Sequence, residues 1–393
     1  MTFQPWPLPI RCRALGGVVL LSTRSQRDHP GRCLPGGPSG KVSSNESPYP
    51  PLAAVSEAMT AWNPALNRYP ERHPERLTLA LAAHHRVSPQ EITVGTGSVA
   101  ALQYLVQASV PAGAELVYGW RSYETYPRLA RINAAHAVQV PLRQEYLDLG
   151  AMARAVTSRT AAIIVCNPNN PSGTLHSTAS LDDFLRQVPR NVLVILDEAY
   201  WEFTGVPEDA SGTRLYRNHP NVAVVRTFSK AFGLAGLRVG YVIARPELTA
   251  LARLCAVPFG VSAGAEDAAL RALEHRSALR ERVAGIVSER ERMWKHLTGN
   301  GFHVPPSRSN FLWLTGLADQ PGLVSACADA GITVRDFPGE GVRVTVATPG
   351  VNDLVCAIAS RFAPADPDHR SAAGTTCRTR PRATAPLRRG HPT

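Results

Sequence analysis

The chain has 393 residues, of which 44% are hydrophobic and 19% charged, a composition that excludes a disordered or fibrous protein. A chain of this length predicts two domains. Its formal net charge of +11 does not indicate a nucleic-acid-binding protein, because two short stretches supply most of it. Residues 1–40 hold five Arg and one Asp, and residues 364–393 hold six Arg and two Asp.

The two basic stretches are rich in Pro, Gly, Ser and Thr, as in "RCLPGGPSG" and "RTRPRATAPLRRG". Such sequences bury too little apolar surface to offset the entropy of the chain. We therefore expect flexible basic tails at residues 1–40 and 364–393, an N-terminal arm at residues 41–70, and no nucleic-acid partner.

The seven cysteines form no C-x-x-C pair and have no metal-ligand spacing. Four of them lie within apolar or helical patterns, where reduced core thiols are usual, which favours the cytoplasm over a disulfide framework. The apolar stretch "ALGGVVLL" is shorter than the roughly 20 residues that span a bilayer. We expect no metal site and no membrane partner.

From about residue 91, apolar runs of strand length alternate with helical patterns. "EITVG" precedes "SVAALQYLVQASV", "ELVYG" precedes "SYETYPRLARI", and "AVQVPL" precedes "DLGAMARAV"; "AAIIVCN", "NVLVILDEAY", "NVAVVRTFS" and "VGYVIA" follow. Nearly continuous β-rich runs indicate strands covered on both faces. The pattern predicts an α/β fold with a mostly parallel central sheet covered by helices, in a large domain at residues 71–262.

After about residue 262 the pattern changes. A long charged amphipathic stretch, "EDAALRALEHRSALRERVAGIVSERERMWKHL", is followed by "SNFLWL", "VSACADAGITV", "GVRVTVAT" and "DLVCAIASRF". This mixture predicts a smaller α+β C-terminal domain at residues 263–363, attached through one connecting helix.

Polar residues follow the predicted strands of the large domain. They are Gly95, Gly97, Ser98, Tyr123, Asn167, Asn170, Asp197, Glu198, Tyr200, Thr227, Ser229 and Lys230. Ligands of open α/β sheets bind outside the carboxyl ends of the strands, so we expect five strand ends to meet at one crevice. Lys230 is one of only three lysines, against 39 arginines. A lysine beside an aspartate, a tyrosine and a Gly-Ser helix start suits an aldehyde cofactor that carries a phosphate.

Residues 41–362 resemble the fold-type I pyridoxal-phosphate aminotransferases, and within them the histidinol-phosphate and aromatic amino acid transaminases. The motifs that carry the resemblance are "SSNESPYPP", "NRYP", "VGTGSV", "CNPNNPSG", "DEAY", "RTFSKAFGLAGLRVGY", "SNFLWL" and "VRDFPGEGVRVTVATP", in the order of the family. The resemblance implies pyridoxal 5'-phosphate as cofactor, an amino acid and a 2-oxo acid as substrates, and a homodimer.

The resemblance implies that Lys230 forms a Schiff base with the cofactor, and that Asp197 pairs with the pyridine nitrogen. The apolar run "VLVIL" before Asp197 indicates a buried carboxylate, which is costly unless paired. The alternatives are a surface lysine and a structural salt bridge from Asp197 to an arginine.

Further residues match cofactor contacts of the family. Asn170 and Tyr200 match the partners of the phenolic oxygen, although Asn170 could instead form an Asx-turn before Pro171. Tyr123 matches the aromatic side chain that stacks on the ring, with Trp120 as a weaker candidate.

The resemblance also implies a phosphate site. It is built from Gly97 and Ser98 at a helix start and from Thr227, Ser229 and Arg238 around Lys230. Tyr69 in "NRYP" matches a tyrosine that reaches the cofactor phosphate of the neighbouring subunit. Its alternative is an aromatic side chain in the core at a helix end.

For the substrate, Arg343 matches the arginine that binds the α-carboxylate in this family, where a planar fork gives bidentate recognition. Arg335, eight residues earlier, is a second candidate anion contact or a solvent-facing strand residue. Asn45 in the N-terminal arm and Asn310 on a strand of the smaller domain complete the candidate substrate site.

Departures from the pattern bear on the amino donor. Val99 and Ala100 stand where histidinol-phosphate enzymes commonly carry acidic residues, and Ser172 replaces the commoner Thr. "YGWRSYETYP" and "VPFGVS" resemble phenylalanine-type transaminases. We therefore expect an aromatic amino acid as donor and 2-oxoglutarate as acceptor, with histidinol phosphate as the alternative donor.

Three other classes share parts of this pattern. A related decarboxylase of phosphorylated amino acids has most of these motifs and differs on the substrate side. A transcription regulator needs a DNA-binding domain of about 60 residues, which 40 Pro/Gly-rich residues cannot supply. A binding module with an inactive site is expected to lose Lys230 or Asp197, and both are present.

Overall fold

The computed structural model describes residues 40–61 and 66–363. The tails predicted at residues 1–40 and 364–393 lie outside these ranges, except for Gly40. The strands are β1 (Ile92–Gly95), β2 (Glu115–Trp120), β3 (His136–Pro141), β4 (Thr160–Cys166), β5 (Leu193–Asp197), β6 (Val222–Thr227), β7 (Gly240–Ile243), β8 (Phe311–Leu314), β9 (Arg335–Phe337) and β10 (Gly341–Thr345).

The α-helices are α1 (Ala53–Ala61), α2 (Glu75–His85), α3 (Ser98–Ser109), α4 (Thr125–Ile132), α5 (Leu149–Arg154), α6 (Thr178–Gln187), α7 (Gly212–Asn218), α8 (Pro246–Cys255), α9 (Ala263–Glu274), α10 (Arg276–Gly299), α11 (Gln320–Asp329) and α12 (Pro349–Ser360). Short 3₁₀ turns are η2 (Pro89–Glu91), η3 (Trp201–Phe203), η4 (Glu208–Ala210) and η5 (Ala235–Leu237).

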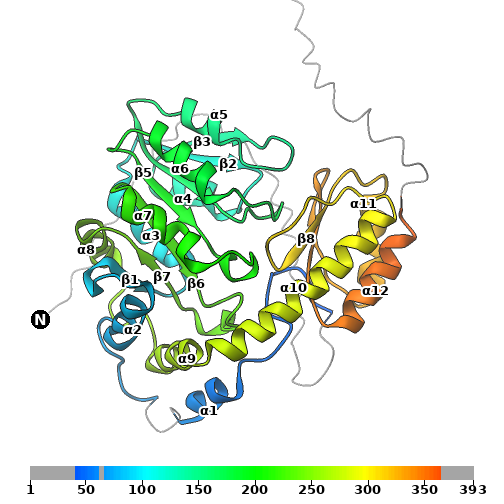
Figure 1. Cartoon of the computed structure of the whole chain (residues 1–393), viewed down its shortest axis with the longest axis horizontal. Helices are drawn as coiled ribbons and strands as arrows, with labels where there is room; N and C mark the ends of the chain where they lie inside the picture. The colour runs from blue at the N-terminus through cyan, green and yellow to red at the C-terminus, as the bar shows by residue number, and fades with distance from the viewer. Residues whose placement is uncertain (1–39, 62–65, 364–393) are drawn as a thin grey trace, which may run out of the picture. The chain divides into compact units, whose positions relative to one another are not determined.

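Seven strands form the larger sheet, in the order β1-β7-β6-β5-β4-β2-β3 (Figure 1). Strand β7 runs antiparallel to both of its neighbours, β1 and β6; the pairs β2–β3, β2–β4, β4–β5 and β5–β6 are parallel. The predicted mostly parallel α/β sheet is therefore confirmed.

Both faces of this sheet are covered, as its apolar sequences predicted. Alternate residues of β4 enter different hydrophobic clusters: Ile163 and Val165 pack on one face, and Ile164 and Cys166 on the other. Residues of α2, α5, α6, α7 and α9 belong to the first cluster, and residues of α3, α4 and α8 to the second. This division fixes which strand-end side chains share a face.

The second sheet is small and antiparallel, in the order β8-β10-β9. Helices α10, α11 and α12 pack with it (Figure 1, yellow to orange). The predicted smaller α+β region is confirmed in its fold, whereas the domain boundary between residues 262 and 263 stays a prediction.

The prediction of one connecting helix is wrong. The charged stretch folds as two helices, α9 and α10, with a break at His275, whose φ and ψ of −100° and 36° are not helical. Helix α9 packs against α1 and α2, whereas α10 packs against α12 and η3, and one straight helix could not make both sets of contacts.

The four cysteines expected as core thiols are free. Cys166, Cys327 and Cys356 are buried and Cys255 is half-buried. Burial raises the pKa of the Cys166 thiol to about 12, so it is held as the neutral thiol. Within residues 40–61 and 66–363, no helix combines the length and the apolar character needed to cross a bilayer.

Candidate active site

The predicted convergence of strand ends follows from the sheet. Strands β1, β2, β4, β5 and β6 point the same way, so their carboxyl ends lie along one edge. Cys166 at the end of β4 is opposite Asp197 at the end of β5, which is opposite Val225 of β6. The residues that follow these strands are therefore neighbours in space.

Lys230 lies three residues beyond β6 and is half-buried, which excludes an ordinary surface lysine. Its Nζ donates a hydrogen bond of 3.0 Å to the carbonyl oxygen of Ser44 and lies 6.0 Å from the ring centre of Tyr200. Burial lowers the pKa of the Lys230 amine to about 8, and the cations Arg343 and Arg238 add to this effect. About a tenth of the amine is therefore neutral and nucleophilic at pH 7, far more than for an exposed lysine.

Asp197 is buried and bonded to neutral groups. The Tyr126 hydroxyl donates to Asp197 Oδ2 at 2.9 Å, and the Ala199 amide donates to Oδ1 at 3.2 Å. Burial raises the pKa of the carboxyl, while these hydrogen bonds and the charge of Lys230 lower it. Among the described residues, no cation forms an ion pair with Asp197, so the alternative of a structural salt bridge is wrong.

Tyr200 joins the large sheet to the N-terminal arm. Its hydroxyl accepts hydrogen bonds from Asn45 Nδ2 at 3.0 Å and from Asn170 Nδ2 at 3.3 Å. Asn170 Oδ1 accepts from Arg343 Nη1 at 2.5 Å, so the side chain of Asn170 bridges two site residues. Asn45 Oδ1 also accepts from the Thr345 hydroxyl at 3.0 Å.

Arg343 is a buried cation with neutral partners. Its second hydrogen bond goes to the carbonyl oxygen of Ser43 at 2.6 Å, and its Nε has no partner. Asn310 is fully buried and donates to the carbonyl oxygen of Asn45, but its Oδ1 also has no partner. Buried polar atoms without partners are costly, and the free Nε of Arg343 is a donor that the oxygen of an anionic ligand could satisfy.

The start of α3 faces the arginine expected at the phosphate. Gly97 has φ 88°, and a Cβ there would lie 2.5 Å from Arg238 Nη2, so only glycine lets the guanidinium approach the helix N-terminus. Arg238 also donates to the Ser229 hydroxyl at 3.4 Å, and the Ser229 amide donates to Thr227 Oγ1 at 3.1 Å. Ser98 is the first residue of α3. A helix start, a guanidinium and hydroxyl groups together form an anion site.

Three further predicted residues have these surroundings. Tyr123 is half-buried, with its ring edge-on to Tyr126 at 5.7 Å between centres. Tyr69 is 87% exposed, so its alternative as a core aromatic is wrong. Arg335 is paired with Glu124, with Nη2 at 2.8 Å and 3.1 Å from the two carboxylate oxygens.

Tyr126 and Glu124 contact site residues but are not among those predicted from the sequence. Tyr126 lies in the first turn of α4, next to the predicted Tyr123, and it reaches Asp197 through its hydroxyl. Glu124 gave no signal in the sequence, because its partner Arg335 is 211 residues away in the chain. Asn167, by contrast, has a structural role, since its side chain bonds only the backbone of His176.

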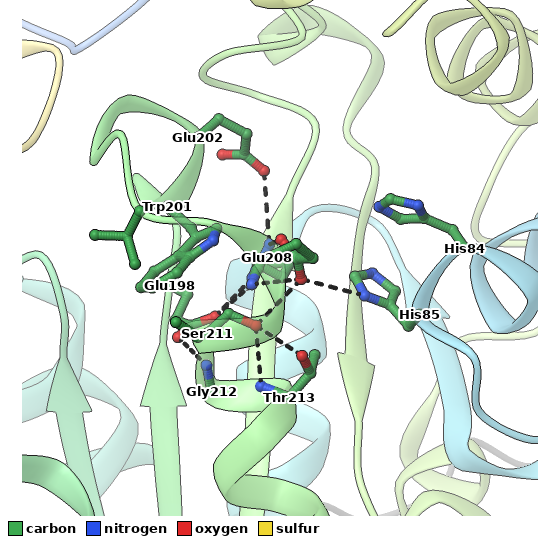
Figure 2. A network of polar contacts seen from close by, with 12 residues as sticks. His84, His85, Glu198, Trp201, Glu202, Glu208, Ser211, Gly212 and Thr213 are labelled. Carbon is green, nitrogen blue, oxygen red and sulfur yellow. Dashed lines mark hydrogen bonds and ion pairs between the residues drawn. The ribbon is translucent and has the colours of Figure 1, made fainter. Parts of the chain in front are cut away.

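Behind the site, a buried ionic cluster holds the same strand ends from the other face of the sheet. Arg226 Nε donates to Glu198 Oε2 at 2.8 Å, and its other nitrogens lie 3.1 Å and 3.9 Å from Glu208 and Glu202. Figure 2 shows Glu208 between the other two glutamates and His85, whose Nδ1 is 3.5 Å from Glu208. Because Glu198 directly follows Asp197, the ion pair between Glu198 and Arg226 connects the end of β5 to β6 beside the site.

The family model for aminotransferase class I and II matches residues 41–358. The chain belongs to this family. The aromatic amino acid aminotransferase of Thermobifida fusca is 47% identical to this aminotransferase over 335 residues, which are 85% of this chain and 93% of that protein. The protein of the same description from Streptomyces coelicolor is 47% identical over 323 residues, 82% of this chain and 90% of the relative.

Among solved structures, the histidinol-phosphate aminotransferase of Sinorhizobium meliloti in complex with pyridoxal-5'-phosphate superposes with a TM-score of 0.77 at 29% identity. The match covers 84% of this chain and 95% of that one. Class I and II aminotransferases depend on pyridoxal phosphate.

The residues of this aminotransferase fit that cofactor. A lysine with a lowered pKa suits its aldehyde, a buried carboxylate without a cation suits its protonated ring nitrogen, and the α3 start with Arg238 suits its phosphate.

Proposed function

We propose that this aminotransferase transfers the amino group between an aromatic amino acid of the phenylalanine type and 2-oxoglutarate. The observation that carries the proposal is Arg343, a buried guanidinium with a free Nε and only neutral partners, which suits the α-carboxylate shared by both substrates. The name shared by relatives at 47% identity supports the aromatic donor.

In this proposal the cofactor is held by groups on both sides of Lys230. Gly97, Ser98 and Arg238, with Thr227 and Ser229, bind the phosphate. Bound pyridoxal phosphate supplies an electron sink for negative charge at the substrate α-carbon. Asp197 would hold the protonated ring nitrogen, Asn170 and Tyr200 would hold the phenolic oxygen, and Tyr123 would support the ring.

Lys230 has two tasks in the proposed reaction. Its neutral amine would hold the cofactor aldehyde, and its Nζ would also be the group that moves the proton at the substrate α-carbon. Arg343 and Asn310 hold the carboxylate so that the α-hydrogen faces this amine, and Asn45 closes the arm over the substrate. The two half-reactions alternate, and the first product leaves before the second substrate binds.

Histidinol phosphate is the second candidate donor, supported by the likeness to the Sinorhizobium meliloti enzyme. The two donors are separated by mixing purified holoenzyme with phenylalanine or with histidinol phosphate and following the cofactor absorbance. We expect fast conversion to the amino form of the cofactor with phenylalanine. Conversion by histidinol phosphate alone would move the enzyme to histidine biosynthesis.

We also propose a homodimer, as the family resemblance implies. Tyr69 lies beside Phe259, with 5.3 Å between ring centres, and Leu66, Leu254 and Val257, which are near them in the sequence, are also exposed. An apolar surface of this kind is typical of a protein interface. Sedimentation of the purified chain is expected to give the mass of two subunits, and Leu254→Arg to shift it toward one. A monomer with full activity would contradict the proposal.

The free thiols agree with the cytoplasm as the location that we propose. Cell fractionation tests this location directly, because the enzyme is expected with cytoplasmic markers.

A further inference from the structure

Two guanidinium groups lie side by side at the substrate end of the site. Arg335 of β9 and Arg343 of β10 are directly opposite each other in the antiparallel pair, so their side chains leave the same face of the small sheet. Both groups also lie over the ring of Phe337, at 5.7 Å and 6.0 Å from its centre. Two neighbouring cations of this kind could hold a ligand with two negative charges.

The two arginines differ in what they already bind. Arg343 has only neutral partners and is 6% exposed. Arg335 Nη2 donates to both carboxylate oxygens of Glu124, which directly follows Tyr123 at the start of α4. Glu124 therefore reaches across from the large sheet and neutralises one of the two cations.

This asymmetry matters because the two candidate donors carry different anions. An amino acid presents an α-carboxylate with one charge and two oxygens, which one planar guanidinium binds through two hydrogen bonds. Histidinol phosphate has a phosphate monoester in its place, with a charge between about −1.5 and −2 at neutral pH and three oxygens. The phosphate needs the second guanidinium, and it would also lie close to the carboxylate of Glu124.

We propose that Glu124 is a specificity-determining residue, which engages Arg335 so that Arg343 alone serves the substrate anion. The enzyme thereby selects donors with an α-carboxylate over phosphate monoesters. The inference rests on the proposed function, and it names the feature of this chain that discriminates between the two donors.

The test is the substitution Glu124→Gln, which removes the charge and keeps the size of the side chain. The holoenzyme is mixed with phenylalanine or with histidinol phosphate, and kcat/KM for each half-reaction is taken from the cofactor absorbance. The ratio of kcat/KM for histidinol phosphate to that for phenylalanine is expected to rise at least about tenfold over the wild type, a difference of about 1.4 kcal/mol.

Glu340→Gln is the matched control. Glu340 pairs with Arg121, with Oε2 at 2.7 Å from Arg121 Nε, and so joins the same two segments of the chain without touching Arg335 or Arg343. We expect this variant to keep the wild-type ratio. In the double variant Glu124→Gln, Arg335→Ala the gain toward histidinol phosphate should disappear, because the freed guanidinium is then absent.

The outcomes separate the inference from the proposed function. If wild-type enzyme reacts with phenylalanine but Glu124→Gln leaves the ratio unchanged, or Glu340→Gln raises it equally, the role of Glu124 is refuted and the proposed function stands. If wild-type enzyme prefers histidinol phosphate while Glu124 is in place, both are overturned.

Discussion

Replacing Tyr126 with Phe removes one of the two hydrogen bonds that the Asp197 carboxylate accepts. A hydrogen bond to a charged group contributes about 1.5–3 kcal/mol. The charged form of Asp197 is already disfavoured by burial, so its pKa should rise further in the variant. If Asp197 pairs with the protonated ring nitrogen, the dissociation constant of pyridoxal phosphate should increase by about tenfold to a hundredfold.

The assay is titration of apoenzyme with pyridoxal phosphate at several pH values. Because Asp197 must be ionised to bind the ring, affinity falls as pH drops through its pKa, and this fall should begin at higher pH in Tyr126→Phe. Tyr118→Phe is the control: Tyr118 is equally buried and packs on Tyr126, but its hydroxyl bonds Gln139 instead. An affinity within about threefold of wild type in Tyr126→Phe, or an equal loss in Tyr118→Phe, would refute the reasoning.

Two further predictions concern the cluster behind the site and the lysine. Arg226→Leu leaves Glu198 buried without its partner and should lower the free energy of unfolding by about 3–5 kcal/mol. Arg226→Lys keeps the charge and should lower this free energy by less. Unfolding in urea measures both variants, and equal losses would show that the charge is unimportant. Because the pKa of Lys230 is about 8 and only the neutral amine reacts, the rate of cofactor capture by apoenzyme should rise about tenfold between about pH 7 and pH 9. A flat profile would contradict this assignment.

The part of the site on the large sheet could be predicted from the sequence for a physical reason. The carboxyl ends of parallel strands lie along one edge, so Asp197 at the end of β5 and Lys230 after β6 had to lie at the same edge once the strands were recognised. Local patterns were sufficient, because each residue is placed by the strand that precedes it.

Contacts between distant segments could not be predicted in the same way. Glu124 and Arg335 form their pair through the packing of two sheets, and no spacing in the chain encodes it. The break at His275 is similar, because the amphipathic pattern continues through it and only the different neighbours of α9 and α10 explain it. The periodicity of the sequence indicates which face of a helix is apolar, whereas the position at which this helix ends depends on tertiary packing.

Lys230 is the residue through which this chain is proposed to transfer amino groups from aromatic amino acids. The most direct measurement is formation of phenylpyruvate from phenylalanine and 2-oxoglutarate by purified holoenzyme, in wild type and in Lys230→Ala. We expect steady turnover in the wild type, with loss of both turnover and the visible absorbance of the lysine-bound cofactor in the variant. Turnover that persists unchanged in Lys230→Ala, or a wild type inactive toward phenylalanine, would contradict the account.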